Sequence, residues 1–178
     1  MDCRTCTSEP VISRRYSGEP LCRRHFVSAV EKTVRRELRK QVAALETNGA
    51  PLRRVAVALS GGKDSTVALH LVQVWAGARR LELVALAVDE GIAGYRPPAL
   101  ECARRCCDAL GVELRVSGYR DLVGMGLDEL LQMQPPAGSP CSPCGILRRR
   151  ALNLAARDAG VDALVLGHNL DDCAQTVL

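Results

Sequence analysis

Ser60-Gly61-Gly62-Lys63-Asp64-Ser65 is the stretch that decides the fold of this 178-residue chain. An apolar run at 55–59 precedes it and an apolar-rich segment at 66–72 follows it, an order typical of a buried strand, a tight turn and a helix. Two glycines permit a sharp turn and a close approach to an anion, and the N–H groups at a helix start favour negative charge. Lys63 adds a cation, and Asp64 is suited to a magnesium-phosphate assembly. The spacing differs from that of a Walker P-loop or a dinucleotide-binding glycine motif.

The chain around this loop alternates between short apolar runs and longer amphipathic segments. We expect strands at 54–59, 82–88, 112–117 and 162–167, and helices at 64–76, 97–110, 121–132, 144–159 and from Asp171 onward. This alternation predicts an α/β fold whose parallel sheet is covered by helices on both faces. Four strands make a small sheet for this architecture, and the sequence stops just after the last expected helix begins. We therefore expect a fragment, incomplete at its C-terminus.

Composition places the chain among globular proteins, with 47% hydrophobic and 25% charged residues. The net charge of +4 is mild, but basic residues gather at 31–40 and at 148–150. Either run alone is as well explained by a solvated helix face; together with a phosphate loop they favour an RNA-facing surface. With no apolar run long enough to span a membrane and no apolar signal core at the N-terminus, we expect a cytosolic protein.

Nine cysteines in a reducing compartment suggest metal ligands more than disulfides. The spacing Cys3-x2-Cys6, fifteen residues, then Cys22-x2-His25 is that of a closed, structural zinc site. Residues 1–26 are too few to bury a core, so we expect zinc to hold them together. The predicted organisation is a zinc-binding module at 1–26, a basic linker helix at 27–50 and a nucleotide-binding domain at 51–178.

Cys141-Ser142-Pro143-Cys144 follows a proline-rich segment and precedes a predicted helix, where the helix dipole stabilises thiolates. Three interpretations stay open from the residues alone: a second zinc site, an iron–sulfur cluster held by three cysteines, or a redox pair. Cys102, Cys106 and Cys107 are interpreted as buried small apolar residues, and Cys173 is given no role.

Gly167-His168-Asn169-Leu170-Asp171-Asp172 follows the last expected strand, at the carboxyl edge of the sheet where open α/β folds bind ligands. Asp172 is a candidate to bind magnesium or to polarise an acceptor. An ordinary helix cap is the competing interpretation, since Asn and Asp are good caps. The phosphate loop at 60–65 favours the functional interpretation of this segment over the helix cap.

Taken together, these motifs resemble the tRNA 2-thiolation enzymes, which belong to the PP-loop ATPases that split ATP between its α and β phosphates. The resemblance covers nearly the whole chain. It includes the zinc module, the 60–65 loop, the segment 88–96 (Val-Asp-Glu-Gly-Ile-Ala-Gly-Tyr-Arg), the run from Cys141 to Leu152 and the segment 167–172. The segments 88–96 and 144–152 resemble the branch that acts on the wobble uridine.

The resemblance implies that the uridine C2 oxygen is adenylated by ATP with Mg²⁺, and that sulfur then replaces it by way of a [4Fe–4S] cluster. It implies ATP-binding positions at Ala58, Ser60, Gly61, Gly62, Lys63, Asp64, Ser65, Val88, Gly167 and Asp172. It implies catalytic positions at Cys141, Cys144, Arg148 and Asp172, with the two cysteines as cluster ligands and zinc on Cys3, Cys6, Cys22 and His25. The implied partners are tRNA, a ubiquitin-like sulfur carrier or free sulfide, and a second copy in a homodimer.

The sequence departs from the family pattern at several points. The family's third cluster cysteine lies beyond the last residue here, and Pro97-Pro98 stands where an acidic pair is common. Three functional hypotheses follow: 2-thiolation of the wobble uridine, position 34; thiolation of another tRNA position; and a non-catalytic, zinc-stabilised tRNA-binding protein.

Overall fold

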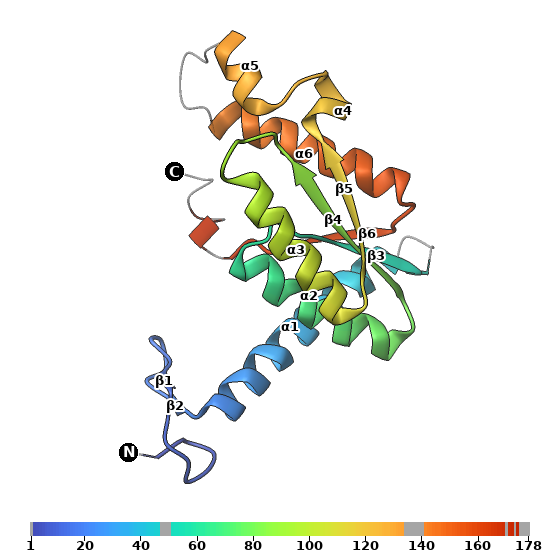
Figure 1. Cartoon of the computed structure of the whole chain (residues 1–178). Coiled ribbons are helices and arrows are strands. Elements are labelled where there is room, and N and C mark those ends of the chain that lie inside the picture. The colour runs from blue at the N-terminus through green and yellow to red at the C-terminus, as the bar shows by residue number, and fades with distance from the viewer. Residues whose placement is uncertain (1, 47–50, 134–140, 170, 173, 175–178) are drawn as a thin grey trace. The chain divides into compact units, whose positions relative to one another are not determined.

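A computed structural model describes residues 2–46, 51–133, 141–169, 171, 172 and 174 (Figure 1). The chain divides into two compact units, residues 1–51 and 52–178. Asn48, Gly49 and Ala50 of the predicted helix break, most of the proline-rich segment and Cys173 lie outside the described residues. Within the described part, no helix is long and apolar enough to cross a membrane.

The first unit contains a small hairpin and one long helix. Strands β1 (Ile12–Ser13) and β2 (Pro20–Leu21) pair antiparallel around a turn in which Gly18 has a φ of +66°. Helix α1 (Arg23–Glu46) follows immediately. The hairpin was not among the sequence-based expectations, because its strands are too short to show a period. Helix α1 starts before the expected boundary at residue 26, so that His25 lies in its first turn.

The second unit is built on a four-stranded parallel sheet in the order β5-β4-β3-β6. Its strands are β3 (Arg54–Ala58), β4 (Glu82–Asp89), β5 (Glu113–Gly118) and β6 (Ala163–Leu166), within two residues of the predicted ranges. The two central strands, β3 and β4, are rich in Val, Ala and Leu and largely buried, whereas the edge strands β5 and β6 are partly exposed.

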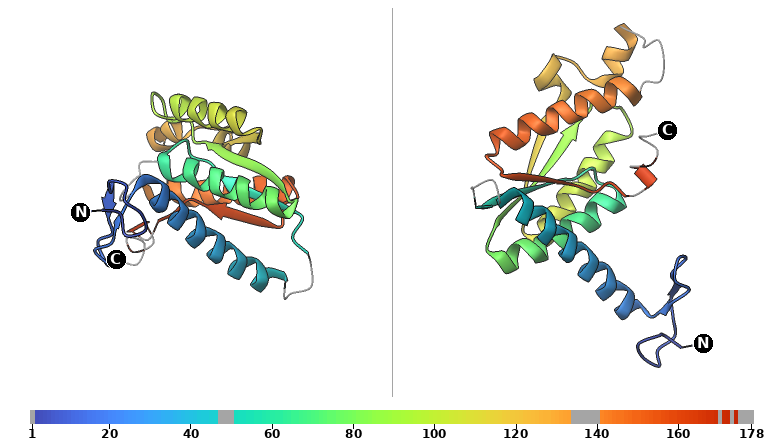
Figure 2. Two further views of the ribbon diagram at one scale, coloured as in Figure 1. Left: turned by 90° about the horizontal axis from the view of Figure 1, so that it is seen from below. Right: turned by 180° about the vertical axis from the view of Figure 1, so that it is seen from behind.

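Helices α2 (Lys63–Arg79) and α3 (Arg96–Leu110) cover one face of the sheet, and α6 (Cys141–Asp158) covers the other (Figures 1 and 2). Right-handed crossovers require this arrangement, because the chain moves outward from β3 to β5 and then returns to β6 beyond β3. On the α6 side, Ala155 and Ala159 pack with Ala56, Val84 and Leu86 of the sheet. The predicted α/β fold with helices on both faces is confirmed.

One expected helix is wrong. The segment predicted as a single helix at 121–132 forms two short helices, α4 (Tyr119–Val123) and α5 (Leu127–Met133). Gly124, with a φ of +81°, ends α4 in the left-handed conformation that only glycine adopts easily. The last long helix also starts earlier than expected, so that Cys141 and Cys144 lie in the first turn of α6.

Candidate functional site

The chain adds β4 and β5 on one side of β3 and then places β6 on the other side. At this switch point the carboxyl ends of β3, β4 and β6 surround one cavity of about 450 Å³. Ligands bind at this kind of edge in open α/β sheets. Eight of the positions expected to bind ATP line the cavity: Ala58, Ser60, Gly62, Asp64, Ser65, Val88, Gly167 and Asp172. Gly61 and Lys63, within the same loop, are not part of its lining.

The loop at 60–65 is held by its own hydroxyls. The Ser65 hydroxyl donates to the Gly62 carbonyl at 3.0 Å and accepts from the Ser60 backbone N–H at 3.2 Å. Gly62 occupies the N-cap of α2 without a side chain that would cover the helix end. This uncapped helix start lines the cavity through Gly62, Asp64 and Ser65, an arrangement that favours a phosphate.

Two glycines let other segments approach this loop closely. Gly61 has a φ of +87°, and a Cβ there would lie 2.2 Å from the Ala99 carbonyl oxygen. A Cβ on Gly167 would lie 2.8 Å from the Ser65 Cα. Both positions therefore require glycine, which is why the loop fits tightly between the start of α3 and the end of β6.

Lys63 and Asp64 form an exposed ion pair, with the Lys63 Nζ 2.8 Å from each carboxylate oxygen of Asp64. Asp64, assisted by the more distant charge of Asp172, raises the pKa of Lys63. Asp172 also accepts from the Asn169 N–H at 2.8 Å, while the Asn169 side chain accepts from the Asp172 N–H at 3.0 Å. These two hydrogen bonds show that the segment forms a helix cap, as the competing interpretation predicted. Asp172 combines it with a place in the cavity wall.

Cys141 and Cys144 occupy the start of α6, beside the cavity. Cys141 is exposed and Cys144 is buried. The Arg148 Nη2 lies 3.4 Å from the Cys144 Sγ, and the Tyr119 hydroxyl donates to the Cys144 carbonyl at 2.7 Å. Gly145, Arg148 and Arg149 line the cavity, so the first two turns of α6 connect the cysteine pair to the loop site.

Glu90 and Arg96 are the site residues that sequence reasoning did not single out. Both are 3% exposed, and their side chains form an ion pair with 2.7 Å between Arg96 Nε and Glu90 Oε2. Glu90 also accepts from the Arg148 Nε at 2.8 Å. Both residues lie in the segment 88–96 that carried the family resemblance. Two charged residues close to two glycines, just after a buried strand, could have indicated in the sequence that this segment belongs to the site.

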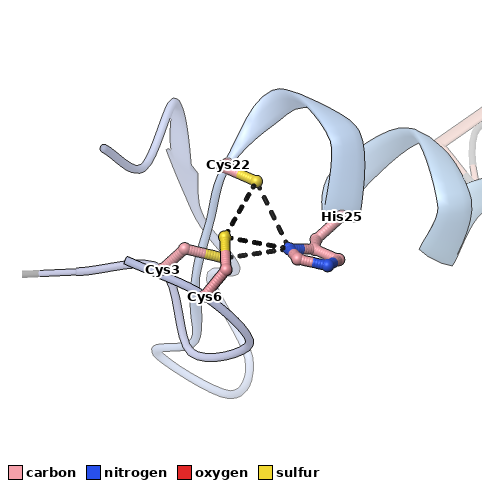
Figure 3. Close-up of side chains that lie close together, drawn as sticks. All are labelled: Cys3, Cys6, Cys22 and His25. Atoms are coloured by element: carbon pink, nitrogen blue, oxygen red, sulfur yellow. Dashed lines mark hydrogen bonds between the residues drawn. The ribbon is translucent and has the colours of Figure 1, made fainter. Parts of the chain in front are cut away.

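The first unit brings together Cys3, Cys6, Cys22 and His25 (Figure 3). The sulfur atoms of Cys6 and Cys22 are 3.8 Å apart, and three sulfur atoms lie 3.3–3.5 Å from the His25 Nδ1. A tetrahedral zinc with ordinary bond lengths would need separations of about 3.8 Å and 3.6 Å. Hydrogen bonds, the largest with the Cys22 backbone, lower the pKa of Cys3 from 9.0 to about 6, whereas burial and the neighbouring thiols of Cys3 and Cys6 raise the pKa of Cys22. The four groups therefore fit a zinc ion.

The Cys141–Cys144 pair has a different donor set. Across the described residues, the Cys3, Cys6, Cys22 and His25 set is the one group of three or more ligand side chains close enough to share a metal. Cys141 and Cys144 thus offer two thiol groups, which fits part of a cluster's ligand set. Cys107 is buried as expected, and burial raises its pKa to about 11, whereas Cys102 and Cys106 are partly exposed.

Comparison with known proteins agrees with this geometry. The family model described as the PP-loop domain matches residues 30–178. The tRNA 2-thiolation protein NcsA of Haloferax volcanii is 38% identical over the whole chain, which covers 56% of that protein. Cytoplasmic tRNA 2-thiolation protein 1 of Drosophila yakuba is 37% identical over 97% of the chain and 49% of its own length.

Among solved structures, the U34-tRNA thiolase NcsA of Methanococcus maripaludis, with its [4Fe-4S] cluster, superposes with a TM-score of 0.83. It is 34% identical, and the match covers 99% of this chain and 57% of that one. The chain therefore spans about half the length of the relatives that it matches.

Proposed function

The chain belongs to the PP-loop family, and on that premise we propose that it serves in the 2-thiolation of the wobble uridine of tRNA. The proposed reaction is transfer of AMP from ATP to the uridine C2 oxygen, followed by replacement of that oxygen with sulfur. The proposal rests on one observation above all. A single cavity is lined both by the Ser60–Ser65 loop and by the turn of α6 that carries Cys144. The adenylating centre and the sulfur-handling centre would thus be neighbours.

In this proposal the nucleotide binds at the carboxyl edge of the sheet, with its phosphates over the start of α2. Ala58 and Val88, which line the cavity, would contact the nucleoside, while the loop and Lys63 would neutralise the phosphates. Asp64 and Asp172 hold the magnesium ion. The C2 oxygen attacks the α phosphorus, the bond to the β-phosphate oxygen breaks, and pyrophosphate leaves. The chain accelerates this step by positioning and by charge neutralisation.

The Cys141–Cys144 pair is proposed to contribute two thiolate ligands to a [4Fe–4S] cluster. When bound, such a cluster supplies a site for the incoming sulfur. Arg148, whose guanidinium contacts the Cys144 Sγ and lines the cavity, stands between this pair and the nucleotide. Zinc on Cys3, Cys6, Cys22 and His25 is proposed to have a structural role, because these four side chains would complete its tetrahedron.

The proposed partners are tRNA and a sulfur source, either a ubiquitin-like carrier or free sulfide, with a homodimer as the proposed assembly. Arg148, Arg149 and Arg150 are exposed on α6 and offer positive charge to the tRNA backbone. A cytoplasmic location is proposed because the Drosophila yakuba relative is named a cytoplasmic tRNA 2-thiolation protein.

Nucleoside mass spectrometry tests this proposal. Protein prepared without oxygen is incubated with unmodified tRNA, ATP, magnesium and sulfide, and the nucleosides are mapped by position. Formation of 2-thiouridine at position 34 is the expected result. The same thionucleoside at another position would favour the second hypothesis. No thionucleoside, from zinc-loaded protein that binds tRNA but not ATP, would favour a binding protein.

A further inference from the structure

Glu90 is a buried carboxylate shared by two arginines that come from different helices. One oxygen accepts from the Arg148 Nε at 2.8 Å. The other lies 2.7 Å from the Arg96 Nε, in an ion pair whose geometry does not make a hydrogen bond. Burying such charges is costly unless they are closely paired, and an apolar cluster of similar volume is often as stable. The arrangement therefore calls for a reason besides stability.

The backbone around Glu90 is tightly held. Its carbonyl accepts from the Leu127 N–H at 2.7 Å, at the start of α5. Gly91 has a φ of +71°, and a Cβ there would lie 2.7 Å from the Gly126 Cα. The carboxylate is thus presented from a segment fixed by close backbone contact, and its direction is set by the fold.

Arg96 connects this carboxylate to the phosphate loop. Its Nη1 donates to the Ser60 carbonyl at 2.8 Å. Three residues further along α3, the Ala99 carbonyl forms the surface against which Gly61 packs. The loop is therefore fastened to the first turn of α3 at two consecutive residues.

Arg148 connects the same carboxylate to the cysteine turn. Its Nε donates to Glu90, while its Nη2 lies 3.4 Å from the Cys144 Sγ. A continuous path of contacts then runs from Ser60 through Arg96, Glu90 and Arg148 to Cys144. The two central contacts of that path are ion pairs of Glu90, and the two outer ones join an arginine to the Ser60 carbonyl and to the Cys144 sulfur.

We propose that Glu90 and Arg96 are positioning residues that fix the loop for the ATP phosphates, and that Glu90 couples this loop to the Cys144 turn through Arg148. The inference rests on the proposed function, because the ligand it concerns is the triphosphate of ATP. Neither Glu90 nor Arg96 is required to touch a reacting atom. Their effect is on where the loop carbonyl and the Arg148 guanidinium lie.

The variant Arg96→Lys separates positioning from packing. Lysine keeps a positive charge beside Glu90, but its single ammonium does not span both Glu90 and the Ser60 carbonyl. We expect calorimetry with zinc-loaded, cluster-free protein to show about a ten-fold loss of affinity for a non-hydrolysable Mg-ATP analogue. Affinity for adenosine, which has no phosphates, should change less than about two-fold. Arg104→Lys, an exposed residue on the same helix, is the matched control and should alter neither.

The coupling is tested by combining Arg96→Lys with Arg148→Gln. The Arg148 side chain is 48% exposed, so Arg148→Gln should fold. It therefore tests the contact with Glu90 even if Arg96→Lys fails to fold. Alone, Arg148→Gln should weaken binding of the ATP analogue about three-fold and leave adenosine binding unchanged. Because both arginines share Glu90, the double variant should lose less affinity than the product of the two single losses.

Three results would overturn the inference. Equal losses for the ATP analogue and for adenosine in folded Arg96→Lys would mean a merely structural role. Losses that multiply in the double variant would remove the coupling through Glu90. Wild-type protein that binds neither ligand would overturn the proposed function and this inference with it, an outcome distinct from the other two.

Discussion

The two cysteine sites of this protein are built in opposite ways. Cys3, Cys6, Cys22 and His25 form a complete ligand set, packed with little more than Leu21, Phe26 and Ala29. Cys141 and Cys144 bring two thiols, and that of Cys144 contacts Arg148, which is part of a charged framework that extends to the phosphate loop. A closed donor set in a small module indicates a metal that holds structure. For two thiols beside a cavity, we propose a role in chemistry instead.

We expect the largest change, a loss of bound zinc, when a ligand of the N-terminal cysteine group is removed. Cys22→Ser removes one of the four ligands, and we expect zinc content to fall by about one atom per chain. The hairpin should lose its protection against proteolysis, because binding energy for a structural zinc is folding energy. Metal analysis and limited proteolysis measure both changes. Cys102→Ser, a partly exposed cysteine outside the group, is the control; unchanged zinc in Cys22→Ser would mean that the four residues are not the ligands.

Cys141→Ser makes the corresponding change at the second site. It should abolish 2-thiouridine formation while leaving zinc content and the affinity for ATP within about two-fold of wild type, because Cys141 is not part of the cavity lining. Nucleoside mass spectrometry and calorimetry provide the two readouts. A variant that thiolates as well as wild type would remove the proposed role of this cysteine.

Asp64→Ala changes the nucleotide site and leaves both cysteine groups intact. Loss of the carboxylate should weaken Mg-ATP binding about ten-fold or more, equivalent to about 1.4 kcal/mol, and leave zinc unaffected. Titration with and without magnesium measures the effect, which should be largest when magnesium is present. Asp108→Ala, an exposed aspartate on α3, is the matched substitution. Equal affinities in Asp64→Ala and Asp108→Ala would contradict the assignment.

Gly61→Ala tests how firmly the loop is seated on α3. A Cβ would lie 2.2 Å from the Ala99 carbonyl oxygen at a φ of +87°, so we expect a loss of about 1–3 kcal/mol in the free energy of unfolding. Gly77→Ala lies within α2 with open space around it and should instead stabilise by about 0.5–1 kcal/mol. Denaturant unfolding compares the two; destabilisation of the same size in both would show that the close contact is unimportant.

The smallest effect concerns Asp162, at the start of β6. Backbone N–H groups of Arg54 and Arg53 donate to its carboxylate and lower its pKa below 3.8. Because the folded pKa is the lower one, its stabilisation is present above the unfolded value and is lost as pH falls through the folded value. Asp162→Asn should therefore cost about 0.5 kcal/mol at pH 6 and less at pH 3. A difference in unfolding free energy between wild type and Asp162→Asn that grows as the pH falls would contradict the assignment. Asp158→Asn is the control.

The sequence allowed the parallel sheet, the loop and the zinc-type group to be predicted because each has a local signature. Apolar runs mark β3 and β4, and the spacing of Cys3, Cys6, Cys22 and His25 marks the metal group. The break at Gly124 was missed because the apolar pattern continues across it and only the backbone conformation interrupts the helix. Glu90 was missed because a buried carboxylate looks like an exposed one until its arginine partners, 6 and 58 positions away, are known.

We propose that one cavity joins ATP cleavage between its α and β phosphates to sulfur insertion beside Cys144. The most direct test is to quantify AMP, ADP and 2-thiouridine in a single oxygen-free reaction with tRNA, ATP, magnesium and sulfide. We expect one AMP, with pyrophosphate, for each 2-thiouridine formed, and no AMP when tRNA is omitted. Formation of ADP and phosphate, or of 2-thiouridine without AMP, would contradict it.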